Sequence, residues 1–283
     1  MYDYTKSRTA SFMNESFTIA YGGGVVQGNM IKETVSIGGL TFDNVSMGIA
    51  NATSPYFQEQ PYVGLLGLGP QSTSGALITR LQSPAHALPA PFSVSEVQSF
   101  ALDFQAAGSD GSASIEFGGI ETKYAGKLAR APLIHTGGHW AVDKVDYSIG
   151  NLRMNSPERV VLGAGNLVVV PPIVAGIYYS RVPGAVVDFP FGDGVSQWLV
   201  PCDAKLPDLA LHIGNGTATI AGASMIGLPV NTSSFSNLST PAGYCNPHIQ
   251  NNSDPYLLGF PFFANNYVVF NRSELALWYA PYA

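Results

Sequence analysis

Alternation of hydrophobic and polar residues, rather than a helical period, dominates this chain. Side chains alternate in four short stretches, which are Phe17–Tyr21, Thr34–Ile37, Ala113–Phe117 and Thr217–Ile220. Such alternation is typical of β-strands with one face toward a core. Glycine-containing turns separate the strands, among them Gly22–Gly24, Gly38–Gly39, Gly118–Gly119 and Asn215–Gly216. The pattern therefore predicts an all-β protein with a sandwich-like or barrel-like architecture.

Helices are expected to be few and short. The best candidates are Thr73–Leu81 and Pro172–Ser180. A weak internal repeat also exists, because Gly64-Leu65-Leu66-Gly67 recurs as Tyr256-Leu257-Leu258-Gly259. Together with a length of 283 residues, the repeat predicts two lobes, at residues 1–140 and 141–283.

The segment VVLGAGNLVVVPP, residues 160–172, combines a buried strand, a glycine turn, a second apolar run and a proline stop. Enzymes often mount catalytic groups on such turns, yet the sequence GAGN offers no acid, base or nucleophile. A dinucleotide-binding fingerprint would need a third glycine where Val168 stands, followed by a βα unit. We therefore interpret this segment as a structural turn.

Composition excludes several function classes. Only 11% of the residues are charged, the net charge is −6, and no run of Lys and Arg could neutralise a nucleic-acid backbone. No apolar stretch reaches the ~18 residues of a membrane span. Neither a zinc-type spacing of Cys and His nor a Gly-X-Ser-X-Gly elbow occurs. We expect no cofactor, metal, nucleic acid or membrane.

Glycosylation motifs are frequent. Of the sixteen asparagines, eight begin an Asn-X-Ser/Thr acceptor: Asn14, Asn44, Asn51, Asn215, Asn231, Asn237, Asn251 and Asn271. Glycans are added in the secretory lumen, so the motifs predict an extracellular glycoprotein, although a chain merely rich in Ser and Asn is the alternative. The start, MYDYTKSR, has no apolar signal core, from which we expect that a front part of the gene product is missing.

Two cysteines, Cys202 and Cys245, are present. If they are oxidised, they close a loop of about 44 residues and stabilise the fold by about 4 kcal/mol. The alternative is a pair of free buried thiols.

Several motifs stand in an order that resembles the pepsin-like aspartic peptidases. They are Phe17–Gly24, Thr34–Thr41, Gly64–Gly69, Ile115–Ile120, Tyr124–Gly126 with Trp140, Trp198–Pro207 and Leu257–Ala280. The match extends from about Tyr2 to Ala280, and the two cysteines are similar to fungal-type members. The resemblance implies a bilobal acid-protease fold, with a flap at Tyr21–Gly24 and an incomplete N-terminal lobe.

Members of this family cleave peptides with two carboxylates that share one proton, each in an Asp-Thr/Ser-Gly turn. The first turn should lie well before the flap, but only twenty residues precede Tyr21 and none of them forms it. The second turn matches residues 160–172, with Gly163 at the Asp position, Ala164 at the Thr/Ser and Gly165 at the Gly. An alternative register places Leu162 at the Asp position. Neither register supplies a carboxylate.

Other positions depart from the family pattern as well, because Val63, Phe260 and Asn271 stand where the family often carries Asp. The remaining candidates for a carboxylate are expected to be solvated loop residues: Asp188, Asp193, Asp203 and Asp208. Tyr21, with Gly22, Gly23 and Gly24, is either a substrate-contacting flap residue or an ordinary strand aromatic.

The sequence thus predicts a secreted, monomeric pepsin-family homologue that is proteolytically inactive. At most it binds an extended peptide or a protein in its cleft. Two alternatives stay open. One is an aspartic-type endopeptidase that lacks its front part with the first Asp-Thr-Gly. The other is the product of a decaying gene copy that does not fold properly.

Overall fold

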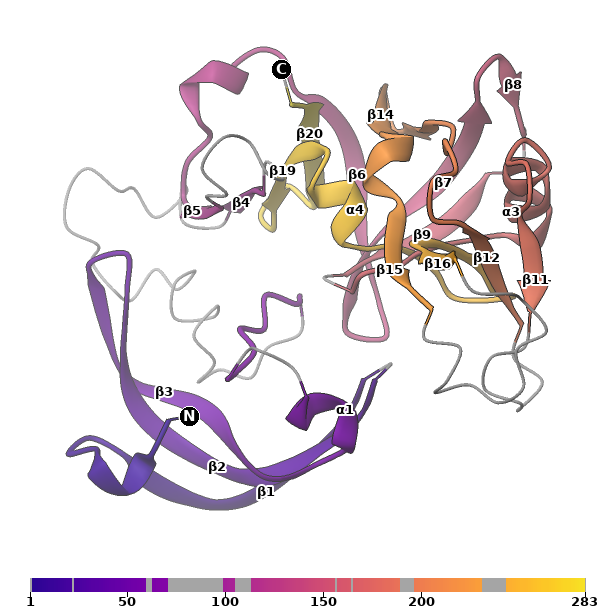
Figure 1. Cartoon of the computed structure of the whole chain (residues 1–283). Coiled ribbons are helices and arrows are strands. Elements are labelled where there is room, and N and C mark those ends of the chain that lie inside the picture. Colours follow the sequence, from indigo (N-terminus) through magenta and orange to yellow (C-terminus); the bar gives the residue numbers. More distant parts are fainter. Residues whose placement is uncertain are drawn as a thin grey trace. The chain divides into compact units, whose positions relative to one another are not determined.

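The computed structural model of the chain divides into two compact units, residues 1–97 and 98–283 (Figure 1). Each unit is described by itself. The structure describes residues 2–21, 23–59, 63–70, 99–104, 113–155, 157–163, 165–188, 196–230 and 243–282.

The first unit is built on three long, curved antiparallel strands (Figure 1). The strands are β1 (Ser11–Tyr21), β2 (Gly24–Ile37) and β3 (Leu40–Thr53), in the order β1-β2-β3. A 3-10 turn η1 (Tyr4–Lys6) precedes them and a short helix α1 (Pro55–Gln58) follows. Few apolar side chains are buried here; in the described part of this unit they are Ile31, Phe42 and Val45.

Glu33 on β2 ties the first residues of the chain to this sheet. The hydroxyls of Tyr2 and Thr9 donate hydrogen bonds to its carboxylate, and the backbone N–H of Thr34 donates a third at 2.7 Å. These donors, the Thr9 hydroxyl first, lower the pKa of Glu33 to about 2. The carboxylate therefore stays ionised although its residue is only 6% exposed.

The second unit contains most of the regular structure. Its strands are β4 (Ser99–Asp103), β5 (Ser114–Phe117), β6 (Ala129–Thr136), β7 (His139–Ile149), β8 (Leu152–Arg153), β9 (Glu158–Leu162), β10 (Val168–Val170), β11 (Val186–Asp188), β12 (Gln197–Pro201), β13 (Leu209–Ile213), β14 (Gly216–Ile220), β15 (Ile226–Pro229), β16 (Tyr244–Pro247), β17 (Ile249–Asn251), β18 (Tyr256–Leu258), β19 (Asn266–Asn271) and β20 (Ala276–Pro281). Its helices are η3 (Thr122–Tyr124), α3 (Pro172–Tyr179), η4 (Gly222–Ser224) and α4 (Phe260–Phe263).

One large sheet organises this unit. Over the described residues, its strands follow the order β17-β10-β18-β9-β7-β6-β20-β19-β4-β5, and β13 and β8 also pair with β7. A smaller sheet has the order β11-β12-β16-β15. The C-terminal strands β19 and β20 lie between β4 and β6, so the end of the chain is part of the core.

Aromatic packing fixes the C-terminal strands. Tyr267 of β19 stacks on Tyr124 with ring centroids 4.0 Å apart, and Phe270 stacks on Phe100 of β4 at 4.8 Å. The hydroxyl of Tyr279 donates a hydrogen bond to the carbonyl of Ile213 at 2.5 Å. Ring stacking of this kind adds about 0.5–1.5 kcal/mol per pair beyond the area that it buries.

The structure confirms the predicted fold class, since the chain is mostly β. The four alternating stretches lie in β1, β2, β5 and β14, and the predicted helix at 172–180 is α3. The helix predicted at 73–81 lies outside the described residues. A lobe boundary at residue 140 stays a prediction. Within the part of the chain that is described, no helix has both the length and the apolar character needed to span a membrane.

Candidate functional site: a loop without carboxylates

The loop between β9 and β10 is the segment whose sequence resembles the second catalytic turn of the pepsin-like peptidases. Strand β18 lies between these two strands, parallel to β9 and antiparallel to β10. The N–H of Gly163 donates to the carbonyl of Leu258 at 3.1 Å, and the N–H of Phe260 donates to the carbonyl of Gly165 at 2.6 Å. Both ends of the loop are therefore held by β18 and the first residue of the helix α4 that follows it.

Gly259, directly after β18, explains how the backbones come so close. A Cβ atom at this position would lie 2.1 Å from the carbonyl oxygen of Gly165 and 2.3 Å from that of Leu167. Both distances are far below van der Waals contact, so only glycine fits. In this copy of the repeated Leu-Leu-Gly, the glycine is therefore required by packing.

Gly163, by contrast, stands in a place that could hold a side chain. Among the residues that the structure describes, a Cβ atom there would meet a single neighbour within 4 Å, the terminal carbon Cδ1 of Leu257 at 3.2 Å. Gly165 is exposed, and Ala164 lies outside the described residues. Gly163, which we predict to stand at the Asp position of the family, therefore has room for a side chain and supplies no ionisable group.

Two apolar side chains are exposed beside the loop. Leu167 is 37% and Phe260 42% exposed, and the centroid of the Phe260 ring lies 6.0 Å from that of Phe104. The N–H of Phe260 donates to the carbonyl of Gly165, which places Phe260 against the loop. That Phe260 stands where the family often carries Asp stays a prediction.

His248 is a titratable residue beside this loop that the sequence did not indicate. Its carbonyl accepts from the N–H of Val168 at 2.8 Å, and its ring hydrogen-bonds the backbone of Asn166. Burial lowers the pKa of His248, and the bond to Asn166 opposes that shift in part. No local pattern could have found it, because the parallel pairing of β17 with β10 brings it there.

The predicted flap is the β1–β2 hairpin of the first unit. Tyr21 pairs with Gly24 at its end, and Gly22 lies outside the described residues. Tyr21 is 41% exposed, and its ring makes an edge contact with Phe57 of α1 at 5.5 Å. Tyr21 is therefore partly exposed, while its ring also packs against α1.

Close contacts hold the hairpin end against helix α1. A Cβ atom on Gly23 would lie 2.4 Å from the ring of Tyr56, and one on Gly24 would lie 2.5 Å from Ser54. The hydroxyl of Ser54 accepts from the N–H of Val25 at 2.8 Å. Close packing therefore explains why glycine stands at both positions. The resemblance to a flap did not predict these contacts.

The glycine segment Gly64–Gly69 has no regular structure, although its repeat in the second unit includes the strand β18. Val63, Leu65 and Leu66 are 75%, 59% and 45% exposed. Together with β3, the segment lines a cavity of about 1110 Å³ within the first unit. Among the described residues, no strand pairs with it in the way that β9 and β10 pair with β18.

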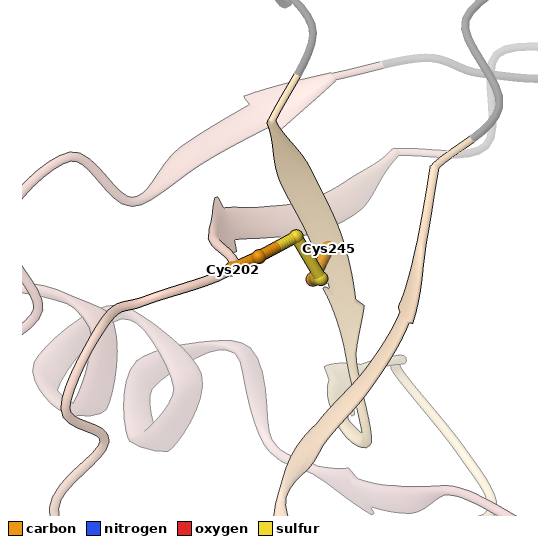
Figure 2. The surroundings of a disulfide bond; sticks show 2 residues. All are labelled: Cys202 and Cys245. Carbon is orange, nitrogen blue, oxygen red and sulfur yellow. A yellow bond between two sulfur atoms is a disulfide. The ribbon is translucent and has the colours of Figure 1, made fainter.

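The predicted disulfide is confirmed. Cys202, which follows β12, is bonded to Cys245 of β16, and their Cα atoms lie 4.9 Å apart (Figure 2). The two strands are also hydrogen-bonded neighbours, with Val200 opposite Cys245. The bond thus closes the small sheet over a sequence separation of 43 residues.

The asparagines of the glycosylation motifs fall into two groups. In the second unit, Asn215, Asn251 and Asn271 use their side-chain oxygen as an acceptor, for the N–H of Arg130, the indole of Trp198 and the N–H of Glu274. In the first unit, Asn14, Asn44 and Asn51 are exposed on strands β1 and β3. Asn231 and Asn237 lie outside the described residues.

One prediction about the acidic residues is wrong. Asp188 is the last residue of β11 and is 3% exposed, so it is not a solvated loop residue. Asp203 and Asp208 are exposed as predicted, and Asp208 accepts from the N–H of Gly222 at 2.8 Å. Asp193 lies outside the described residues. Strand β11 has only three residues, which are too few to show an alternating pattern in the sequence. The burial of Asp188 could therefore not be predicted.

Comparisons with known proteins agree with this geometry. The family model of the eukaryotic aspartyl proteases matches residues 1–282, and the chain therefore belongs to this family.

Among curated relatives, it is 27% identical to a probable aspartic-type endopeptidase of Trichophyton verrucosum, over 100% of this chain and 66% of that protein. It is 29% identical to penicillopepsin-1 of Talaromyces stipitatus, over 99% of this chain and 68% of that protein. The chain thus spans about two thirds of the length of these relatives.

In structure, it is similar to the aspartic proteinase from Irpex lacteus. The TM-score is 0.75 at 19% identity, and the match covers 100% of this chain and 85% of that one. At this identity, the likeness establishes the fold.

Proposed function

We propose that this chain is a proteolytically inactive member of the pepsin family that retains at most the binding of an extended peptide or a protein. The observation that carries the proposal is the β9–β10 loop, where Gly163-Ala164-Gly165 stands in place of a catalytic Asp-Thr/Ser-Gly. The proposal is supported by the pairing of β18 with both strands of this loop and by the lack of any ionisable side chain in residues 163–167.

The chemistry of the family needs two carboxylates, one as base and one as acid. No Asp-Thr-Gly or Asp-Ser-Gly occurs anywhere in the 283 residues. Each lost general acid or base costs a factor of roughly 10² to 10⁴ in rate. With both groups absent, the chain lacks the acid and the base that activate water in this family.

Peptide binding does not depend on those carboxylates. The exposed ring of Tyr21 and the glycine-rich hairpin end offer apolar contact and backbone hydrogen bonds, as in strand addition. We infer further that the protein acts as a secreted, glycosylated monomer, on the basis of its eight acceptor motifs and its disulfide.

A hydrolysis assay tests the loss of activity. The purified chain is incubated with a denatured protein at pH 3 to 5, with and without pepstatin, beside an active pepsin as a positive control. We expect no cleavage above the buffer blank. Pepstatin-sensitive cleavage would contradict the proposal.

Binding is measured separately, by calorimetric titration with a mixed library of extended peptides. Tyr21→Ala should weaken binding about tenfold, since an aromatic contact contributes roughly 1 kcal/mol or more. Phe12→Ala, which removes an exposed aromatic near the other end of β1, is the matched control and should leave binding unchanged. Equal affinity of wild type and Tyr21→Ala would exclude the flap from the binding site.

One observation favours a second candidate, an aspartic-type endopeptidase of which this chain is a part. The chain spans only 66% and 68% of the length of two fungal relatives. A longer coding sequence with an Asp-Thr-Gly before Met1 would support this candidate. The longer protein would then have to cleave substrate with Gly163 opposite its single Asp, and the same hydrolysis assay decides this.

A further inference from the structure

Three irregularities interrupt the β1-β2-β3 sheet, and each one contains an asparagine of a glycosylation motif. In β1, residues 13–15 stand opposite the single residue 30 of β2, between the pairs Phe12↔Ile31 and Ser16↔Asn29. The middle residue of this bulge is Asn14.

Strand β3 carries the other two irregularities. Asp43 and Asn44 stand opposite Thr34, between the pairs Glu33↔Val45 and Val35↔Phe42. Asn51 is the extra residue between Ala50 and Ala52, whose partners Gly28 and Gln27 are adjacent. All three asparagines are exposed.

The backbone accounts for part of this pattern. Asn14 and Asn44 have φ angles of 54° and 57°, in the left-handed region that asparagine tolerates better than most residues. The backbone preference for asparagine does not explain why a hydroxyl residue follows two positions later in each case. These residues, Ser16, Ser46 and Thr53, complete the acceptor motifs. The fourth asparagine of this unit, Asn29, lies on the central strand and begins no motif.

The three motifs also lie on the two strands that need protection. Strands β1 and β3 are the edges of the sheet, and among the described residues no further strand pairs with either. Strand β1 is exposed along almost all of its length, with Phe12 at 59% and Ile19 at 44%. A long exposed edge with one acidic side chain, Glu15, is a template for pairing with another chain.

The edge of β3 also borders the cavity of the first unit. The cavity of the first unit is lined by the nine consecutive residues 45–53, and Asn51 is among them. Successive side chains of a strand point to opposite faces, so a cavity that touches all of them runs along the strand edge. A glycan on Asn51 would stand beside this groove.

We propose that N-linked glycans on Asn14, Asn44 and Asn51 shield the two edges of this sheet and prevent strand pairing with a second copy of the chain. The proposal rests on the secretion inferred above. A bulge turns the local ladder away from a partner, and the bulky, solvated sugar occupies the space that an added strand would need.

The experiment removes the sugars and keeps the asparagines. The chain is secreted from a eukaryotic host as wild type and as Ser16→Ala/Ser46→Ala/Thr53→Ala, which leaves the left-handed residues in place. Ser253→Ala, which removes the motif of Asn251 in the second unit, is the matched control. Glycopeptide mass spectrometry gives the occupancy, and light scattering after size exclusion gives the association state.

We expect the three sites to be occupied, the wild type and the control to be monomeric, and the triple variant to associate at a concentration at least tenfold lower than the wild type. Hydrogen exchange should slow in β1 or β3 of the associated form. Should the variant fail to be secreted, enzymatic removal of glycans from folded wild type gives the same comparison. Unoccupied sites, or a deglycosylated protein that stays monomeric, would overturn the proposal. Neither readout depends on peptide cleavage, so the two proposals fail independently.

Discussion

At the scale of single residues, two glycines of the β9–β10 region have opposite roles. Gly259 is required by packing, because a Cβ atom would overlap the carbonyl oxygens of Gly165 and Leu167. Gly163 is not required by packing, since its only close neighbour would be the flexible end of Leu257. Packing therefore requires a glycine at position 259 but not at position 163.

This difference gives a matched pair of substitutions. Gly259→Ala should lower the free energy of unfolding by about 3 kcal/mol, because a methyl group is forced into two carbonyls. Gly163→Asp should change it by about 1 kcal/mol or less and should restore no peptidase activity, because a single carboxylate has no partner. Urea unfolding and the acid hydrolysis assay measure both effects. Equal destabilisation by the two substitutions would contradict this assignment.

At the scale of elements, Glu33 makes the anchoring of the N-terminal residues depend on pH. Its folded pKa of about 2 lies below the ordinary value of 4.5. The stabilisation is therefore complete above pH 4.5 and is lost as the pH falls through about 2. We expect the thermal midpoint of the first unit to fall over this range in the wild type and to fall less in Glu33→Gln.

The matched control is Glu15→Gln, which removes an exposed carboxylate of β1 from the same sheet. It should leave the wild-type pH dependence unchanged. An identical acid profile for wild type and Glu33→Gln would show that the anchor does not depend on this carboxylate.

The disulfide determines the stability of the small β11-β12-β16-β15 sheet. Cys202→Ala/Cys245→Ala should reduce the free energy of unfolding by about 4 kcal/mol, as expected from the chain entropy of a loop of this length. Wild-type protein unfolded in the presence of a reductant should behave like the double variant. Unchanged denaturation midpoints in both experiments would contradict a stabilising role for this bond.

At the scale of the whole molecule, the two units differ in how much apolar surface they bury. In the described residues, the first unit buries Ile31, Phe42 and Val45, whereas the second buries large clusters around β7, β9, β13 and β19. Burial of apolar area is the main source of stability. We therefore expect β1, β2 and β3 to open before the second unit does.

Native-state hydrogen exchange measures this difference directly. Amides of β1–β3 should exchange at least tenfold faster than those of β7 and β9 in glycosylated protein at neutral pH. A single cooperative transition with equal protection in both units would contradict the expectation. Such a result would also count against the idea that the first unit is the weaker part of the fold.

Much of the fold and part of the candidate site could be predicted from the sequence. Alternation predicted the strands at 17–21 and 217–220, and the local sequence predicted a helix at 172–180, which is α3. The position of His248 beside Asn166 and the burial of Asp188 could not be predicted, because they depend on which strands become neighbours. The structural reasons for Gly23 and Gly24 depend likewise on contacts with α1.

The sequence by itself determined the β class, the membership of the aspartyl protease family and the lack of an Asp-Thr/Ser-Gly turn. These follow from residue identity and from the order of short motifs. Only the tertiary structure decided that β18 is inserted between β9 and β10, and that Gly259 rather than Gly163 is needed for packing. It also decided that the sheet irregularities coincide with the glycosylation motifs. The physical reason is that register and close approach arise between residues far apart in the chain, where no local pattern records them.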